Sequence, residues 1–129
     1  MAYGSVLTDV VQSSVTGTPP QFNDGAGTQT GTLCRAWVNY KGTATVSIRA
    51  SFNVSSVTYN STGDYTINFT NALADANYSS VVSGGNKNSG YTVGTHEGTT
   101  PTSSAFRVLN SYPGIAVGDA TYVYAAVFR

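Results

Sequence analysis

The sequence predicts an all-β protein: a single antiparallel β-sandwich or jelly-roll-like domain with an extended N-terminal arm. Val, Thr and Tyr, which fit a pleated surface, number 15, 18 and 9 in a chain of 129 residues. Several segments alternate apolar and polar residues with a period of two, as half-buried strands do. Clusters of Gly, Asn and Asp separate these segments at the intervals typical of antiparallel hairpins.

Residues 1–31 are predicted to form the arm. They contain Pro19-Pro20 and a Gly-rich run at 23–28, which is loop chemistry with little to bury. Apolar residues from Val6 to Val15 recur at near-helical spacing, but most are β-branched, so we expect an extended or partly helical segment. The arm is either an edge strand with a loop or an attachment segment for other proteins. It has neither the basic nor the apolar stretch of a signal peptide, so we expect none.

Residues 32–129 are predicted to form the β-sandwich module. On its first strand, Trp37 lies opposite the face shared by Cys34, Ala36, Val38 and Tyr40. The stretch 44–54 alternates most regularly and predicts one strand with a buried apolar face. We therefore expect three of its residues to be nearly fully buried, namely Val46, Ile48 and Phe52.

Further strands follow the turn at residues 60–64. Tyr65, Ile67 and Phe69 alternate with polar residues, and shorter strands are expected at 78–82, 91–94 and 105–109. Polar connections are expected at 83–90, 95–104 and 110–119. The chain then closes with a strand at 121–129, which gives seven or eight strands and no helix.

The strand at 121–129 is apolar on both faces, since Tyr122 and Tyr124 alternate with Val123, Ala125 and Val127. Such a strand is either central in a sandwich or covered by another subunit. An exposed apolar strand would promote aggregation, so we expect other copies of the chain to cover it. The candidate subunit-interface residues are Trp37, Val123 and Val127.

Charge and cysteine content exclude several classes of function. The formal net charge is zero and charged residues make up only 9%, so no basic stripe exists for nucleic acid or an anionic membrane surface. We expect no membrane insertion, because no apolar run approaches a bilayer span. Cys34 is the only cysteine, which excludes an intrachain disulfide. One histidine and one cysteine predict neither a metal site nor a cofactor.

Candidate contact residues lie in or beside the long polar connections. Tyr91, His96 and Tyr112 are flanked by Asn, Ser, Gly and Thr, and an aromatic ring among hydrogen-bonding groups suits a saccharide or protein contact. Packing over their own loops is the equally open alternative. No catalytic residue is assigned, because no nucleophile motif occurs and Asp64, Asp75 and Asp119 stand in turn contexts. A small carbohydrate-active hydrolase that uses Asp and Glu is the remote alternative.

Long strings of the sequence resemble a known protein module. They are CRAWVNYKGTATVSIRASFNVSSV at 34–57, GDYTINF at 63–69 and DANY at 75–78, with a similar opening at 1–14 and closing strand at 123–129. Together they resemble a module of bacteriophage tail-fibre and related virion proteins, most frequent in phages and prophages of aquatic bacteria. The resemblance covers about residues 32–129, densely as far as 82, and includes no catalytic motif.

The resemblance implies a virion protein that is assembled in the host cytoplasm and is not an enzyme. It implies a homotrimer that recognises a host glycan or surface protein, attached to other virion proteins through residues 1–31. The module commonly ends a much longer fibre, whereas about 31 residues precede it here. A capsid or tail decoration protein, or cement protein, is therefore the alternative within the same class.

Overall fold

The computed structural model describes residues 21–23, 28–30, 33–86, 89–90, 92–96, 98–111 and 117–129. The chain divides into two compact units, Met1–Leu33 and Cys34–Arg129, two residues from the predicted boundary. In the first unit, β1 (Gln21–Asn23) pairs antiparallel with β2 (Thr28–Thr30). The stretch that was predicted to be extended or partly helical, Val6–Val15, lies outside the described residues, and the attachment role of the arm stays a prediction.

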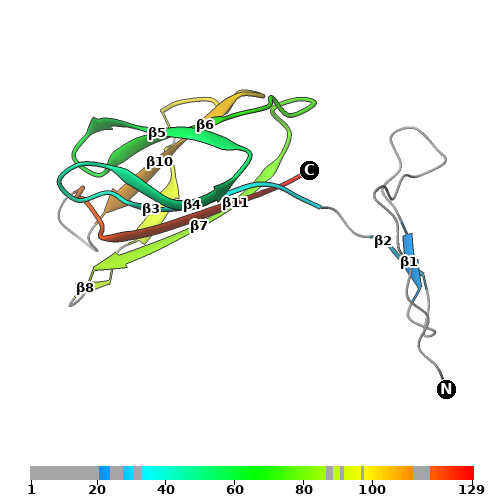
Figure 1. The fold of residues 1–129 in the computed structure, drawn as a ribbon, viewed down its shortest axis with the longest axis horizontal. Helices are drawn as coiled ribbons and strands as arrows, with labels where there is room; N and C mark the ends of the chain where they lie inside the picture. Colours follow the sequence, from blue (N-terminus) through cyan, green and yellow to red (C-terminus); the bar gives the residue numbers. More distant parts are fainter. Residues whose placement is uncertain are drawn as a thin grey trace, which may run out of the picture. The chain divides into compact units, whose positions relative to one another are not determined.

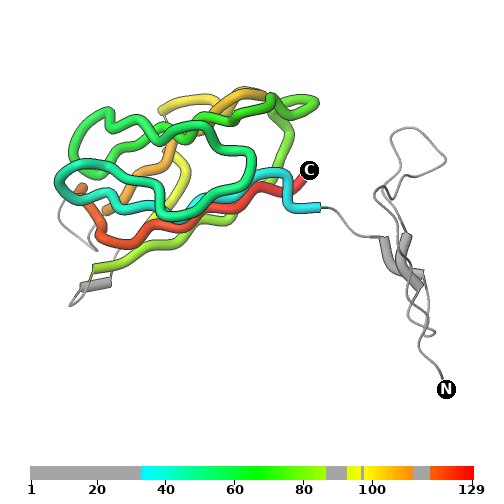
Figure 2. The backbone as a smooth tube through the Cα atoms, in the orientation of Figure 1, coloured from blue at the N-terminus to red at the C-terminus, as the bar shows by residue number. Residues whose placement is uncertain are grey.

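The second unit is a β-sandwich of two antiparallel sheets (Figures 1 and 2), and its described residues contain no helix, which confirms the predicted all-β class. Sheet I has the order β5 (Val54–Ser61), β6 (Asp64–Phe69), β10 (Ala105–Ser111) and β9 (Thr92–Thr95). Sheet II has the order β4 (Ser47–Phe52), β3 (Cys34–Lys41), β11 (Tyr122–Phe128), β7 (Ser79–Asn86) and β8 (Ser89–Gly90).

The core lies between the sheets and is built from alternate residues of four inner strands. Since side chains of a strand point to opposite faces in turn, every second residue of these strands is buried. Tyr40 of sheet II and Tyr65 of sheet I meet edge to face, with ring centroids 5.4 Å apart. The prediction that 36, 38 and 40 share an inner face, and likewise 65, 67 and 69, is confirmed.

The prediction for residues 44–54 is wrong. This stretch forms two strands in different sheets, because the chain leaves β4 after Phe52 and enters β5 at Val54. Strand β4 is an edge strand of sheet II with all six residues exposed, including Phe52 at 54% and Ile48 at 36%. Val46 is partly buried, and only Val54 of this stretch belongs to the buried core.

Asn53 makes this crossover between the sheets. Its φ is 54°, a left-handed conformation that Asn tolerates better than most residues. Its Nδ2 donates to the carbonyl oxygens of Arg35, at 3.0 Å, and Asn71, at 3.1 Å, and its Oδ1 accepts from the backbone N–H of Asn71 at 2.8 Å. One side chain thus ties the crossover to β3 and to the segment that precedes β7.

Strand β11 lies in the middle of sheet II, antiparallel to both β3 and β7; it is the red strand of Figure 1. The polar connection that was expected at 83–90 is instead largely strand, since β7 continues to Asn86 and pairs with β8. Strand β9 covers 92–95 where 91–94 was expected.

A polar cluster fixes the chain just before β11. Oδ1 of Asp119 lies 2.6 Å from the hydroxyl oxygen of Tyr65 and accepts from the backbone N–H of Gly63 at 2.7 Å. Burial, followed by the hydrogen bond to Asp119, raises the pKa of Tyr65. Gly63 has a φ of 72°, and a Cβ there would lie 2.7 Å from the carbonyl oxygen of Asn110. The turn between β5 and β6 therefore requires glycine at position 63. The backbone N–H of Gly63 also fixes Asp119, which lies shortly before β11 in the sequence.

Two isoleucines test which residues form the core. Ile67→Ala removes a side chain that is 1% exposed in the centre of sheet I, so we expect a loss of about 2 to 5 kcal/mol of unfolding free energy. The same substitution at Ile48, on the exposed edge strand, should lose about 1 kcal/mol or less. Urea unfolding followed by circular dichroism measures both, and equal losses would contradict the described placement of β4.

Asn53 offers a second test. Asn53→Gly keeps the left-handed backbone but removes the side-chain hydrogen bonds, so we expect a loss of about 1 kcal/mol. Asn53→Val also forces a β-branched residue into that conformation, and the loss should rise to about 2 to 3 kcal/mol. A valine variant as stable as the wild type in thermal unfolding would show that the crossover is not fixed by this residue.

Candidate functional site

The outer face of sheet II carries exposed aromatic and apolar side chains. We call this surface the aromatic face and define it by six residues: Trp37, Phe52, Val81, Tyr122, Tyr124 and Ala126. Trp37 is 40% exposed, Phe52 54% and Val81 60%. On β11, Tyr122 and Tyr124 lie on this side because they alternate with the buried residues Val123 and Ala125.

Strand register places four of these side chains in one row. Trp37 of β3 is opposite Phe52 of β4 on one side and opposite Ala126 of β11 on the other. Ala126 is in turn opposite Val81 of β7. An apolar row therefore crosses four neighbouring strands, each contributing one residue.

The outer face of sheet I has the opposite character. Nδ2 of Asn68 donates to the hydroxyl oxygens of Ser56 and Thr58, both at 3.0 Å, and Nδ2 of Asn60 donates to Oγ1 of Thr66 at 2.9 Å. These polar side chains satisfy one another across β5 and β6. The apolar character of sheet II's outer face is thus particular to that sheet.

Arg49 of β4 is held against the aromatic face by three contacts. Its guanidinium donates to the carbonyl oxygen of Thr121 at 2.8 Å and to Oδ1 of Asn39 at 3.3 Å. Its Cζ lies 4.7 Å from the centroid of the Tyr122 ring, within cation–π range. These three contacts fix the position of the guanidinium, and all three partners are neutral, so the face keeps the positive charge of Arg49.

A shallow groove of about 380 Å³ runs over β3, β11 and β7. Its volume falls in the range of small-molecule sites, roughly 300 to 1,000 Å³. The side chains that line it are those of Trp37, Asn39, Val81, Ser83, Tyr124 and Ala126. Ala126 of β11 is the smallest residue of the apolar row and lies between the larger Trp37 and Val81. The hollow therefore lies over β11.

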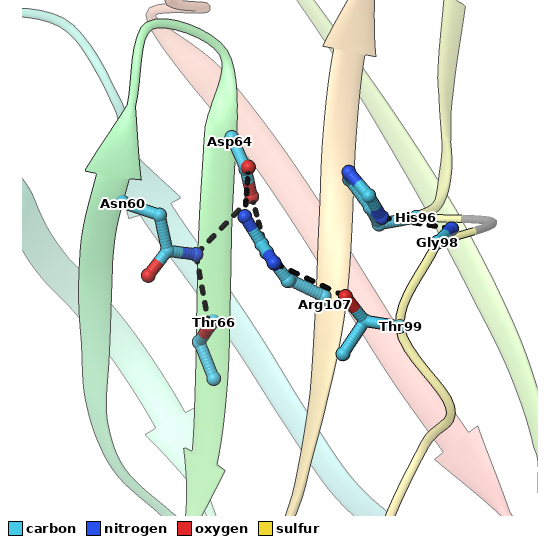
Figure 3. A network of polar contacts seen from close by, with 7 residues as sticks. All are labelled: Asn60, Asp64, Thr66, His96, Gly98, Thr99 and Arg107. Atoms are coloured by element: carbon cyan, nitrogen blue, oxygen red, sulfur yellow. Dashed lines mark hydrogen bonds and ion pairs between the residues drawn. The ribbon is translucent and has the colours of Figure 1, made fainter.

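A second cluster, on sheet I, centres on an ion pair between Asp64 of β6 and Arg107 of β10 (Figure 3). Nε of Arg107 donates to Oδ1 of Asp64 at 2.8 Å, a second bond joins Nη2 to Oδ2, and Nη1 donates to Oγ1 of Thr99 at 3.1 Å. The hydrogen bond from Arg107 holds the pKa of the Asp64 carboxyl below its usual value. Asp64 is only 5% exposed, although the pair lies on the outer face of sheet I beside Asn60, so Arg107 and its neighbours shield it from solvent.

His96 lies beside this cluster and shapes its own loop. Its Nδ1 accepts from the backbone N–H of Gly98 at 3.0 Å, and its backbone N–H donates to the carbonyl oxygen of Arg107 at 2.9 Å (Figure 3). The other two candidate contact residues, Tyr91 and Tyr112, lie outside the described residues. The contact role of all three stays a prediction.

The predicted subunit-interface residues divide into two groups. Trp37 is exposed at the centre of the aromatic face. Val123 and Val127 are 0% and 1% exposed within a single chain, so their assignment to an interface is wrong. The physical reason is that sheet I already covers the inner face of β11, which leaves the tyrosine face outward.

The sequence did not single out Phe52, Val81 or Tyr124 as surface contact residues. Alternation assigned Phe52 to the core, and the strands of Val81 and Tyr124 lack a consistently polar face that would mark the outside. The one available signal was the hydroxyl of Tyr124, since a tyrosine ring is more readily hydrated than valine.

The described carboxylates have structural partners. Asp75 forms an exposed ion pair with Arg129 and accepts from the backbone N–H of Asn77 at 2.8 Å, while Asp64 and Asp119 make the contacts given above. Glu97, which follows His96 and is a further acidic residue that a hydrolase could use, lies outside the described residues. Within the described ranges, no group of three or more His, Cys, Asp or Glu side chains is placed to hold a metal ion.

Comparisons with protein-family models, curated proteins and solved structures found no match. No helix in the described part of the chain is long and apolar enough to cross a membrane. The function is therefore inferred from the residues and from the surface that they form.

The Asp64–Arg107 pair predicts a pH dependence of stability. Because the pKa of Asp64 is lowered on folding, the pair stabilises the fold above the pKa of an unfolded Asp, about 3.9. This contribution is lost as the pH falls through the lower, folded-state pKa. We expect urea unfolding free energies to fall below about pH 4 in the wild type, and less steeply in Asp64→Asn.

Asp75→Asn is the matched control for this measurement. In the wild type the Asp75 carboxylate is 38% exposed and its ion pair with Arg129 is open to solvent. Solvent therefore screens the contribution of this pair to stability. The acid slope should change less than in Asp64→Asn. The opposite order of the two slopes would contradict the stabilising role of the Asp64–Arg107 pair.

Proposed function

We propose that this protein is a non-enzymatic structural component of a bacteriophage virion, a tail-fibre-like module whose activity is adhesion to the host surface. It works as a homotrimer, is assembled in the host cytoplasm and is attached to other virion proteins through residues 1–31. The long strings at 34–57, 63–69 and 75–78 support the virion assignment through their resemblance to tail-fibre modules.

The observation that carries this proposal is the aromatic face. A β-sandwich that exposes Trp37, Phe52 and Val81 on one sheet, while the other sheet is polar, presents a surface suited to contact with another macromolecule. The hydrogen bonds of Asp64, Asp75 and Asp119 support a structural rather than a catalytic use of these carboxylates.

Host contact is proposed at the loops that connect β8 to β10 and β10 to β11, where Tyr91, His96 and Tyr112 are found in the sequence. The partner is a host glycan or surface protein, because aromatic rings among Gly, Ser and Thr offer both an apolar surface and hydrogen bonds. His96 orders its loop through Gly98, which would hold the contact in a fixed shape.

Particles made from the genome that encodes this chain test the assignment. Antibodies against the module should label the tips of tail fibres in electron micrographs, and the purified chain should reduce adsorption of the phage to its host. Label over the capsid, with no effect on adsorption, would favour the decoration or cement role. Absence of the chain from purified particles would contradict a virion component.

An enzymatic test accompanies this experiment. The purified chain should release no sugar from host surface polysaccharide. Release that is abolished by His96→Ala or Glu97→Gln would instead support the hydrolase alternative.

A further inference from the structure

The outer face of sheet II carries positive charge that no described carboxylate balances. Its cations are Arg35 and Lys41 of β3 and Arg49 of β4. The five strands of this sheet contain no Asp or Glu, and the two ion pairs of the described residues belong instead to Arg107 and Arg129. A chain whose formal net charge is zero thus gathers uncompensated positive charge on one face.

The three cations flank the groove over β11. The outward residues of β3 are Arg35, Trp37, Asn39 and Lys41, of which the middle two line the groove. Six residues of strand separate the two outer ones, about 20 Å at the usual rise per residue. Arg49 donates to Oδ1 of Asn39, so its guanidinium lies at the groove's edge. This spacing suits a chain that carries several negative charges better than a single small anion.

The lining of the groove combines aromatic rings with unused polar groups. Trp37 and Tyr124 are 40% and 44% exposed, and each offers the flat side of a ring. Four polar groups of the lining make no hydrogen bond to another described residue: Nε1 of Trp37, Nδ2 of Asn39 and the hydroxyls of Ser83 and Tyr124. A pyranose has the matching chemistry, because its ring has an apolar C–H side and its hydroxyls both donate and accept.

We propose that this groove binds an acidic polysaccharide, a chain of pyranose rings that carry carboxylates. The rings lie against Trp37 and Tyr124, and the carboxylates of successive rings meet the flanking cations. This inference rests on the proposed function, since it names the class of host glycan. It adds a contact surface on sheet II to the one proposed at the loops.

Arg49 is the cation best prepared for a carboxylate. A guanidinium has five N–H donors, and the bonds to Asn39 and Thr121 use two of them. Those bonds and the Tyr122 ring already hold the side chain, so little of its freedom remains to be lost on binding. Charge-assisted bonds from arginine to a carboxylate are among the stronger hydrogen bonds in proteins.

Other polyanions match this face less well. An extended peptide binds a sheet by pairing with an edge strand, whereas β3, β11 and β7 each have a strand on both sides. A nucleic-acid strand is held mainly by cations that neutralise successive phosphates, and three cations spread over about 20 Å serve few of them. A polysaccharide depends less on charge, because its rings also use the aromatic and polar lining.

Fluorescence titration of the full chain tests the proposal. Trp37 is the only tryptophan, so its emission reports on the groove. The probes are hexamers of galacturonic acid and of mannuronic acid, and maltohexaose is the uncharged control of equal length. We expect at least one acidic hexamer to change the emission and to bind about fivefold or more tightly than maltohexaose. Its affinity should fall between about 50 and 500 mM salt, because salt screens exposed charges.

Opposite charges at one position locate the site. Val81 lines the groove and is 60% exposed, so Val81→Asp and Val81→Lys should both stay folded. The aspartate should weaken binding of the acidic hexamer about fivefold or more, and the lysine should preserve or strengthen it. Thr58→Asp introduces the same negative charge on the outer face of sheet I and should leave the affinity as in the wild type. Circular dichroism checks that each variant is folded.

Several outcomes would overturn the inference. They are no response to either acidic hexamer, equal affinity for maltohexaose, and equal affinity of folded Val81→Asp and Val81→Lys chains. Tighter binding of hexaglutamate or of a thymidine hexanucleotide would also overturn it and assign the face to an acidic peptide or to nucleic acid.

The proposed function is decided separately. If the purified chain reduces phage adsorption but neither acidic hexamer binds, the inference fails while adhesion through the loops stands. If an acidic hexamer binds as expected but the chain is absent from purified particles, the groove stands and the virion assignment fails.

Discussion

The insertion of β11 between β3 and β7 is the constraint on which the rest of the sandwich depends. Without this strand, sheet II would be two separate pieces, because β3 and β7 are joined only through it. The same seven residues supply Val123, Ala125 and Val127 to the core. Hydrogen bonding in one sheet and packing against the other thus depend on a single segment whose partners lie far away in the sequence.

Much of the fold follows from period-two patterns, and the exceptions have a common cause. The inner faces of 34–40 and 65–69 were predictable because polar residues mark their outer sides. In 44–54 the alternation continues through Asn53, although the chain turns there into the other sheet. Alternation records which side of a strand is apolar, but it carries no information about a change of sheet.

The aromatic face shows a second limit. On β11 both sides are apolar, so the pattern could not say that the small residues Val123 and Val127 point inward while the tyrosines point outward. Trp37 could be named from its own strand. Its neighbours Phe52 and Val81 could not, because they become neighbours only through the order of four strands. Strand order is a property of the whole chain, which a local pattern does not reveal.

The position of β11 also bears on when the protein can fold during translation. A ribosome must synthesise and release residues 122–128 before sheet II can close, and earlier lengths of chain hold β3 and β7 without the strand that joins them. Pairings between distant segments are slow to form because the intervening chain must first be ordered. Nascent chains would therefore expose their valines and tyrosines until synthesis has passed this point. Folding of the module must therefore wait until β11 has been synthesised, and shorter lengths of chain cannot form the native sheet.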